Sequence, residues 1–133
     1  MSAVFTDTSG LLALLNPEDD NHARAKAAFA SLRVRRASLV STSFVLVETY
    51  ALLGRRFGLE AIRRFREDFA PLIEVVWVDG PLHEAGLDLL LGRRTRRLSL
   101  VDAVSFVTMR QRALNEAFAF DPHFEQEGFA LLT

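Results

Sequence analysis

The sequence contains no cysteine, so disulfides, thiolate metal sites and cysteine nucleophiles are excluded. It also lacks a membrane-spanning run of roughly 20 apolar residues. The most apolar window, residues 44–53, is interrupted by Glu48. The first residues do not resemble a signal peptide, because Thr6 and Asp7 interrupt the only apolar run there. Together these absences favour a cytoplasmic protein without a membrane segment.

Lysine is almost missing as well: of sixteen basic residues only Lys26 is a lysine. The arginines are clustered within residues 33–36, 55–56, 63–66 and 93–97. Arginine suits bidentate contacts with phosphate, yet a net charge of −1 gives the molecule no strong basic field. For each cluster taken singly, a solvated surface is the favoured interpretation.

The length of 133 residues predicts a single domain. Short apolar segments, expected as buried strands, alternate with longer segments of helical periodicity. The expected strands are 2–6, 39–41, 73–78, 117–120 and 129–132, and the expected helices are 9–16, 18–32, 44–57, 59–69, 81–91 and 99–112. This alternation predicts a three-layer α/β/α domain with a short, mostly parallel sheet of four to five strands. A helical bundle is the alternative, if the short strands are misread.

Four acidic residues lie in apolar surroundings. Asp7 and Asp121 each follow an expected strand, whereas Glu48 and Asp102 lie within apolar helices. A buried carboxylate is costly unless it has a partner. The carboxyl ends of parallel strands converge on one edge of a sheet. The four acids are therefore expected to meet at that edge.

Each acid also has a purely structural explanation. These are a helix cap for Asp7 or its neighbours Thr8 and Ser9, an arginine or backbone partner for Glu48, a capping box with Ser99 for Asp102, and a turn before Pro122 for Asp121. Each explanation is plausible for one acid. It is harder for four separate explanations to account for all four acids lying at the same edge of the sheet.

Four converging carboxylates would repel one another. Two unit charges about 4 Å apart cost about 4 kcal/mol at an effective dielectric constant near 20. A cation would offset this repulsion, and an all-oxygen ligand set favours Mg²⁺ or Mn²⁺ over Zn²⁺. One or two such ions can activate water and stabilise charge on a phosphodiester. The cluster thus predicts metal-dependent phosphodiester chemistry.

The chain resembles the PIN-domain ribonucleases, and most of all the VapC-type toxins of bacterial toxin–antitoxin pairs. The resemblance rests on residues 4–9, the mid-helix Glu48, residues 98–103, and residues 118–124 with Gly128-Phe129. It implies a small metal-dependent endoribonuclease that is homodimeric and is held inactive by an antitoxin encoded beside it.

In this resemblance Asp7, Glu48, Asp102 and Asp121 match the acidic quartet of the family, and Ser9 matches a hydroxyl near the metal site. Asp7 and Asp102 are expected to bind the metal directly. Glu48 is expected as a further ligand or as the group that orients the attacking water. Asp121 is expected to bind a second ion or to hold a metal-bound water. The reaction implied is in-line attack by metal-activated water on RNA.

Residues outside the quartet are given weaker roles. Arg93, Arg94, Arg96 and Arg97 precede Asp102 and could steer RNA phosphates, with a solvated loop as the alternative. His123 is interpreted as a surface histidine rather than a base. Some of the phenylalanines could form a groove for an antitoxin helix.

Three rival functions remain open. A PIN-type nuclease could act in RNA processing without an antitoxin. A receiver-type signalling module also gathers acids around Mg²⁺, but it needs a lysine late in the chain, where this sequence has none. A binding or scaffold domain with an inactive site would leave the four acids as an unexplained stability cost.

Overall fold

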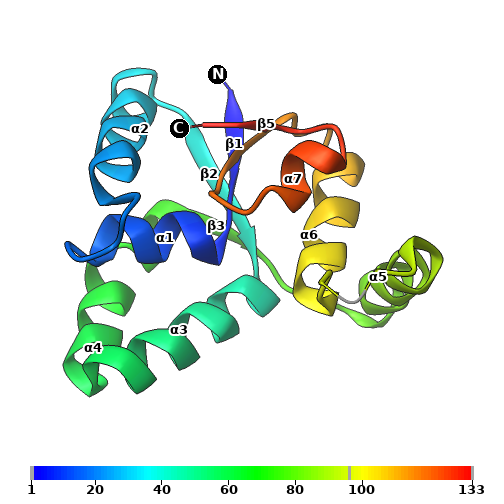
Figure 1. The fold of residues 1–133 in the computed structure, drawn as a ribbon, viewed down its shortest axis with the longest axis horizontal. Helices are drawn as coiled ribbons and strands as arrows, with labels where there is room; N and C mark the ends of the chain where they lie inside the picture. The colour runs from blue at the N-terminus through cyan, green and yellow to red at the C-terminus, as the bar shows by residue number, and fades with distance from the viewer. Residues whose placement is uncertain (1, 96, 133) are drawn as a thin grey trace.

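The fold is built on a parallel sheet. The computed structural model describes residues 2–95 and 97–132, and within them the sheet has five strands in the order β3-β2-β1-β4-β5 (Figure 1). The strands are β1 (Ala3–Thr6), β2 (Ser38–Thr42), β3 (Ile73–Val76), β4 (Glu116–Phe118) and β5 (Ala130–Leu131). Every neighbouring pair is parallel. The predicted α/β class and parallel sheet are confirmed, and the helical bundle is excluded.

Helices connect the strands. They are α1 (Thr8–Leu15), α2 (His22–Val34), α3 (Ser43–Phe57), α4 (Leu59–Asp68), α5 (Gly80–Arg93), α6 (Leu100–Gln111) and α7 (His123–Gln126), with a 3₁₀ turn at Ala70–Leu72. Within the described residues, no helix combines the length and apolar character that crossing a membrane requires. The four-residue α7 was not predicted, because so short a helix shows no periodicity.

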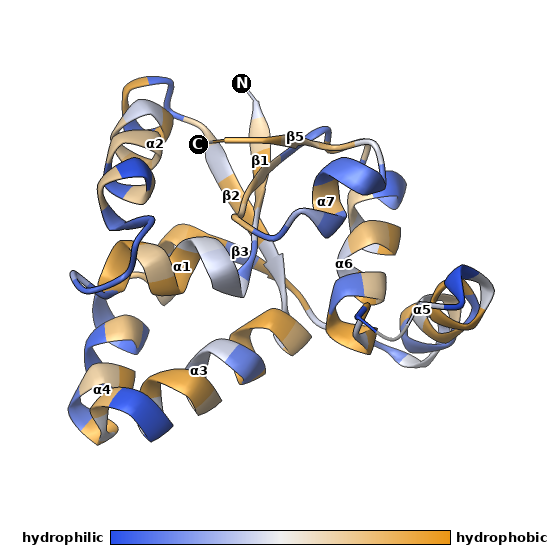
Figure 2. Cartoon of the chain, viewed as in Figure 1, coloured by the Kyte–Doolittle hydropathy of each residue, from blue (hydrophilic) through white to orange (hydrophobic). Residues whose placement is uncertain are grey.

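The predicted start of the second helix is wrong. Residues 18–20 form a turn, and α2 begins only at His22. The Asn16 side chain accepts the Glu18 backbone N–H, and the Asp19 side chain accepts that of Asn21. Such local side-chain bonds compete with helix formation. The turn is visibly hydrophilic in Figure 2.

The strands β3 and β4 each end two residues earlier than predicted, and in each case a serine hydroxyl accepts a backbone N–H two residues beyond the strand. The strand β3 ends at Val76, and the N–H of Val78 donates to the Ser43 hydroxyl. The strand β4 ends at Phe118, and the N–H of Phe120 donates to the Ser9 hydroxyl. Both bonds connect the segment after a strand to the start of a helix.

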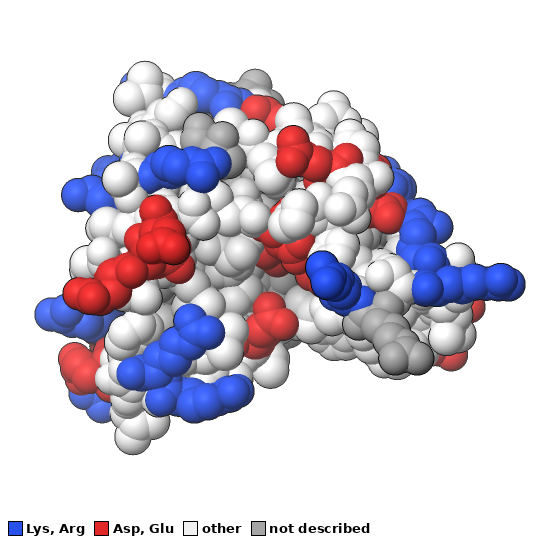
Figure 3. All heavy atoms as spheres, in the orientation of Figure 1, with Lys and Arg blue, Asp and Glu red and all other residues white. Residues whose placement is uncertain are grey.

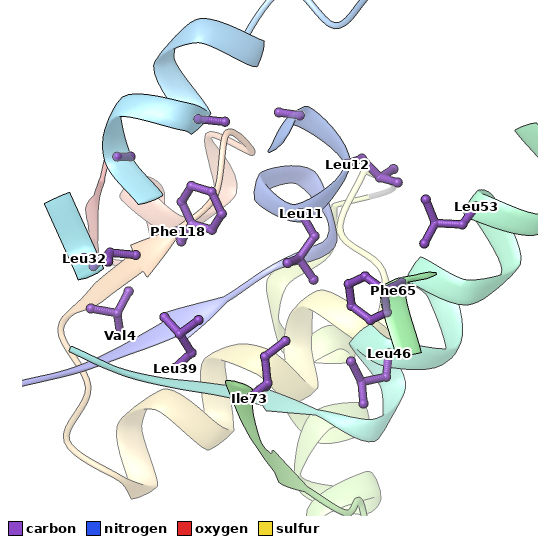
Figure 4. Close-up of a cluster of buried hydrophobic side chains, with 13 residues drawn as sticks. Val4, Leu11, Leu12, Leu32, Leu39, Leu46, Leu53, Phe65, Ile73 and Phe118 are labelled. Atoms are coloured by element: carbon purple, nitrogen blue, oxygen red, sulfur yellow. The ribbon is translucent and has the colours of Figure 1, made fainter. Parts of the chain in front are cut away.

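Two apolar clusters cover the two faces of the sheet, giving the predicted three layers. Alternate residues of one strand serve opposite faces: Val4 belongs to one cluster and Phe5 to the other. Figure 4 shows the first cluster, where Leu11 of α1 and Phe65 of α4 point toward Ile73 of β3. In the second cluster, Phe106 of α6 packs against Phe124 of α7.

The chain changes direction across the sheet beside β1. From β1 it adds β2 and then β3 on one side, and it later returns to add β4 and β5 on the other. Ligands of open α/β sheets bind where the strand order reverses in this way, outside the carboxyl ends of the strands. Asp7 follows β1 and Asp121 follows β4, so both acids lie at this point.

Candidate active site

All four acids line one open cavity. Its volume is about 300 Å³, and its lining comprises Asp7, Thr8, Ser9, Leu12, Glu48, Leu52, Ser99, Asp102 and Asp121. The face drawn in Figure 3 has acidic side chains around a central hollow, over the starts of α1, α3 and α6, with basic side chains on both flanks. The structure thus brings together acids that are up to 114 residues apart, taking Asp7 to Asp121 as 121 − 7.

Asp7 is both a helix cap and a member of the cavity. Its Oδ2 accepts the Ser9 backbone N–H at 3.1 Å and the Ser9 hydroxyl at 2.6 Å, so it caps α1 as the structural explanation required. The residue is only 4% exposed. This burial, with Asp102 and Glu48 nearby, raises the pKa of Asp7 to about 7. A carboxylate in this setting gains from a neighbouring cation.

Asp102 is likewise both a helix-capping residue and a member of the cavity lining. It forms the predicted capping box, in which the Ser99 hydroxyl accepts the Asp102 N–H at 3.1 Å and Asp102 Oδ2 accepts the Ser99 N–H at 3.2 Å. The capping box involves Oδ2 of Asp102. The second carboxylate oxygen, Oδ1, takes no part in the box. Burial, and to a smaller degree the neighbouring Asp121, raise the pKa of Asp102.

Glu48 reaches the cavity from the middle of α3. It is half-buried, and among the described residues no arginine pairs with it. Hydroxyl groups hold α3 against α1. Thr8 donates to the Val45 carbonyl at 3.3 Å, and its hydroxyl is hydrogen-bonded to that of Thr49 at 3.0 Å. The sequence reasoning missed Thr8 and Thr49 as positioning residues; a buried hydroxyl beside the acid in an apolar helix was the available signal.

Asp121 lies against His123. Asp121 Oδ1 accepts the backbone N–H of His123 at 2.9 Å, and His123 Nδ1 lies 2.8 Å from the same oxygen. One ligand atom each from Asp102, Asp121 and His123 can lie within 4.8 Å of one another. The His123 side chain is only 19% exposed. The interpretation of His123 as a surface histidine is therefore wrong.

The arginines are divided between structural and exposed positions. Arg93 ends α5 instead of opening a loop, and its guanidinium donates twice to Glu127, at 2.8 and 2.9 Å. Arg110 binds the same carboxylate at 2.9 Å. Arg94 and Arg97 are exposed, whereas Arg96 lies outside the described residues. The Arg93 guanidinium is thus paired with a carboxylate of the protein itself.

The donor chemistry of the cavity fits a hard divalent cation. The acids offer carboxylate oxygens, which are the ligands that Mg²⁺ and Mn²⁺ prefer. Burial and neighbouring carboxylates put electrostatic strain on the ionised forms of Asp7 and Asp102 and raise the pKa of each. A cation would relieve that strain, because a positive charge stabilises the ionised form of each acid.

Comparison with known proteins places this fold and cavity in a family. The family model described as PIN domain matches residues 4–129. The 23S rRNA-specific endonuclease VapC20 of Mycobacterium tuberculosis is 35% identical over 127 residues, which cover 95% of each chain. The crystal structure of that protein, described as a sarcin-ricin loop cleaving toxin, superimposes with a TM-score of 0.86, 34% identity, and coverage of 96% of this chain and 97% of that one.

More distant structures share the fold. The structure of FitAcB from Neisseria gonorrhoeae has a TM-score of 0.73 at 15% identity, covering 98% of this chain and 96% of that one. A structure of FitAB bound to a DNA fragment has a TM-score of 0.72, also at 15% identity, covering 96% and 92%. The family model and the match to VapC20 confirm the resemblance to VapC-type PIN proteins, and the receiver-type alternative is wrong.

Proposed function

This chain belongs to the PIN-domain family, and on that premise we propose that it is a metal-dependent endoribonuclease that acts as the toxin of a toxin–antitoxin pair. The observation that carries the proposal is the meeting of Asp7, Glu48, Asp102 and Asp121 at one cavity, from four separate segments of the chain. Likeness over nearly the whole length to the endonuclease VapC20 supports the same activity.

Each acid of the cavity has its own role in the proposed reaction. Asp7 and Asp102 would hold a divalent cation, Mg²⁺ or Mn²⁺, and Glu48 would be a further ligand or orient the attacking water. Asp121 would hold a second ion or a water. The cation would supply positive charge that makes water more acidic and stabilises the charge developing on the phosphodiester. Ser9 keeps the Asp7 carboxylate in place through its two hydrogen bonds.

The proposed substrate is a structured RNA in the cytoplasm, with ribosomal RNA as the first candidate. VapC20 is described as specific for 23S rRNA and as cleaving the sarcin-ricin loop. In this chain Arg94 and Arg97 are exposed in the segment that leads to the Ser99–Asp102 capping box. They are available for phosphate contacts at the edge of the cavity.

The proposed partners are an antitoxin and a second copy of the chain. A cavity of about 410 Å³ between α1, α3 and α4 is lined mainly by apolar residues, with three charged ones among them: Leu15, Leu53, Phe57, Ala61, Phe65, Phe69, Glu60, Arg64 and Asp68. Such a groove suits the apolar face of an antitoxin helix. For the homodimer, the exposed apolar Val47 and Trp77 offer surface that a second copy could cover.

Induced expression in a bacterial host tests this function. We expect growth arrest and a new 5′ end in 23S rRNA, mapped by primer extension, and both effects should disappear with Asp102→Asn. The matched control is Asp20→Asn, a change of an exposed acid in the turn before α2, which should remain toxic. Co-expression of the protein encoded in the adjacent frame should restore growth. Growth arrest without cleavage of RNA would refute the nuclease activity. Failure of the co-expressed protein to restore growth would favour a PIN nuclease without an antitoxin.

A further inference from the structure

His123 is placed among the acids without a role in the proposed function. It is the first residue of α7, and one of its ring nitrogens lies within 4.8 Å of carboxylate oxygens of Asp102 and Asp121. The aromatic packing of Phe124, the next residue, against Phe5 and Phe106 anchors this short helix on the sheet. His123 is therefore held at the site by the core rather than by a mobile surface segment.

The Nδ1 atom of His123 is buried and has no hydrogen-bond partner among the described residues. It lies 2.8 Å from Asp121 Oδ1, a contact that is an ion pair only when the imidazole is protonated. That oxygen already accepts the backbone N–H of His123. A buried polar atom without a partner costs about 1–3 kcal/mol. With a neutral imidazole, this atom lies beside two carboxylates and has no hydrogen-bond partner among the described residues.

A divalent cation would give this nitrogen a partner. Neighbouring ligand atoms on an octahedral ion with bonds of about 2.1 Å lie about 3.0 Å apart. The 2.8 Å between His123 Nδ1 and Asp121 Oδ1 is close to that spacing. We propose that His123 is a nitrogen ligand of a divalent cation bound by Asp102 and Asp121, which is the ion that Asp121 is proposed to hold. This inference rests on the proposed metal dependence and extends the ligand set beyond the four acids.

The nitrogen ligand has a consequence for the choice of metal. Imidazole suits the softer transition metals, whereas Mg²⁺ prefers oxygen ligands throughout. A site that includes His123 therefore favours Mn²⁺ over Mg²⁺ more strongly than an all-carboxylate site does. The other two histidines are placed elsewhere: His22 Nδ1 contacts the Ala13 carbonyl at 2.9 Å, and His83 packs against Phe44 and Glu84.

Pulsed electron paramagnetic resonance of bound Mn²⁺ tests the proposal directly. The protein is prepared without a histidine tag, so its only histidines are His22, His83 and His123. We expect ¹⁴N modulation of the Mn²⁺ echo, which changes to the ¹⁵N pattern when the protein is labelled with ¹⁵N-histidine. The signal should disappear in His123→Ala and remain in His22→Gln and His83→Gln.

Calorimetry of the same variants adds a second measurement. His123→Ala should weaken Mn²⁺ binding about ten-fold and Mg²⁺ binding by a smaller factor. His123→Asn should recover part of the affinity without the imidazole signal, because its amide oxygen can occupy a similar place. Bound Mn²⁺ without histidine modulation, in a protein that still needs the ion to cleave RNA, would overturn the His123 ligand and leave the nuclease intact. Failure of Mn²⁺ to bind would overturn both.

Discussion

The hydroxyl of Ser9 donates to the Asp7 carboxylate across 2.6 Å. The oxygen of the same Ser9 hydroxyl accepts the backbone N–H of Phe120 at 3.0 Å. Ser9 thereby connects the start of α1 to the segment that carries Asp121. One side chain fixes the relative positions of two acids that come from opposite ends of the sequence.

Removal of that hydroxyl should loosen the site without unfolding the protein. In Ser9→Ala we expect cation affinity to fall about ten-fold, since groups that orient ligands contribute about 10–100-fold to metal binding. Calorimetric titration with Mn²⁺ measures the change, and thermal unfolding checks the fold. Ser31→Ala, a change of an exposed serine on α2, is the control. Unchanged affinity in Ser9→Ala would show that Ser9 does not position Asp7.

A close approach at Gly10 holds α1 against β4. A Cβ atom at this position would lie 2.3 Å from the Phe118 carbonyl oxygen, which also accepts the Asp7 backbone N–H at 3.1 Å. Gly10→Ala must push α1 away from the strand, and we expect a loss of about 1–3 kcal/mol in unfolding free energy.

Urea denaturation measures this loss. The control is Gly92→Ala in α5, where an added Cβ meets nothing within 4 Å. That change should be neutral or stabilising by up to about 1 kcal/mol, because alanine is the better helix former. Equal effects of the two substitutions would contradict a specific contact at Gly10.

The ionisation of Asp7 should lower the unfolding free energy of the metal-free protein as the pH rises. The pKa of Asp7 is raised from 3.8 to about 7, so between these values the folded state binds more protons than the unfolded state. The contribution of Asp7 is therefore fully present below about pH 4 and is lost as the pH rises through about 7. In EDTA at pH 8, Asp7→Asn should be more stable than the wild type by roughly 2–4 kcal/mol.

Urea denaturation of the two proteins from pH 4 to pH 8 measures that difference, which should shrink toward pH 4. Asp20→Asn should follow the wild type over the whole range. A constant difference between Asp7→Asn and the wild type would mean that Asp7 does not titrate in this window.

Glu127 should have the opposite pH dependence. It is bound by Arg93 and Arg110, is 12% exposed, and has its pKa lowered from 4.5 to about 2. Its stabilising effect is present above pH 4.5 and is lost as the pH falls through about 2. Glu127→Gln should lower stability at pH 7 by about 1–2 kcal/mol, with a difference that narrows below pH 4.5. Glu125→Gln, on the exposed side of α7, should have no such effect in thermal unfolding.

The parallel sheet and the meeting of the four acids at one edge could be predicted from the sequence, because both follow from the pattern of apolar residues along the chain. Glu48 and Asp102 stood out as charges in apolar helices, and their location followed from the parallel topology. The start of α2 was missed because Asn16 and Asp19 bind backbone groups locally. The position of His123 was missed because it depends on α7, which is fixed by the packing of Phe124 and not by any repeating pattern. The Arg93–Glu127 pair joins residues 34 apart, and no local rule predicts such a partner.

Cleavage of an end-labelled sarcin-ricin loop RNA by the purified chain tests the central claim most directly. The reactions contain EDTA, Mg²⁺ or Mn²⁺, and the proteins are the wild type, Asp7→Asn and Asp20→Asn. We expect a single cut that needs the ion, is abolished in Asp7→Asn and is unchanged in Asp20→Asn. Cleavage that persists in EDTA, or full activity in a folded Asp7→Asn protein, would contradict a metal-dependent nuclease at this cavity.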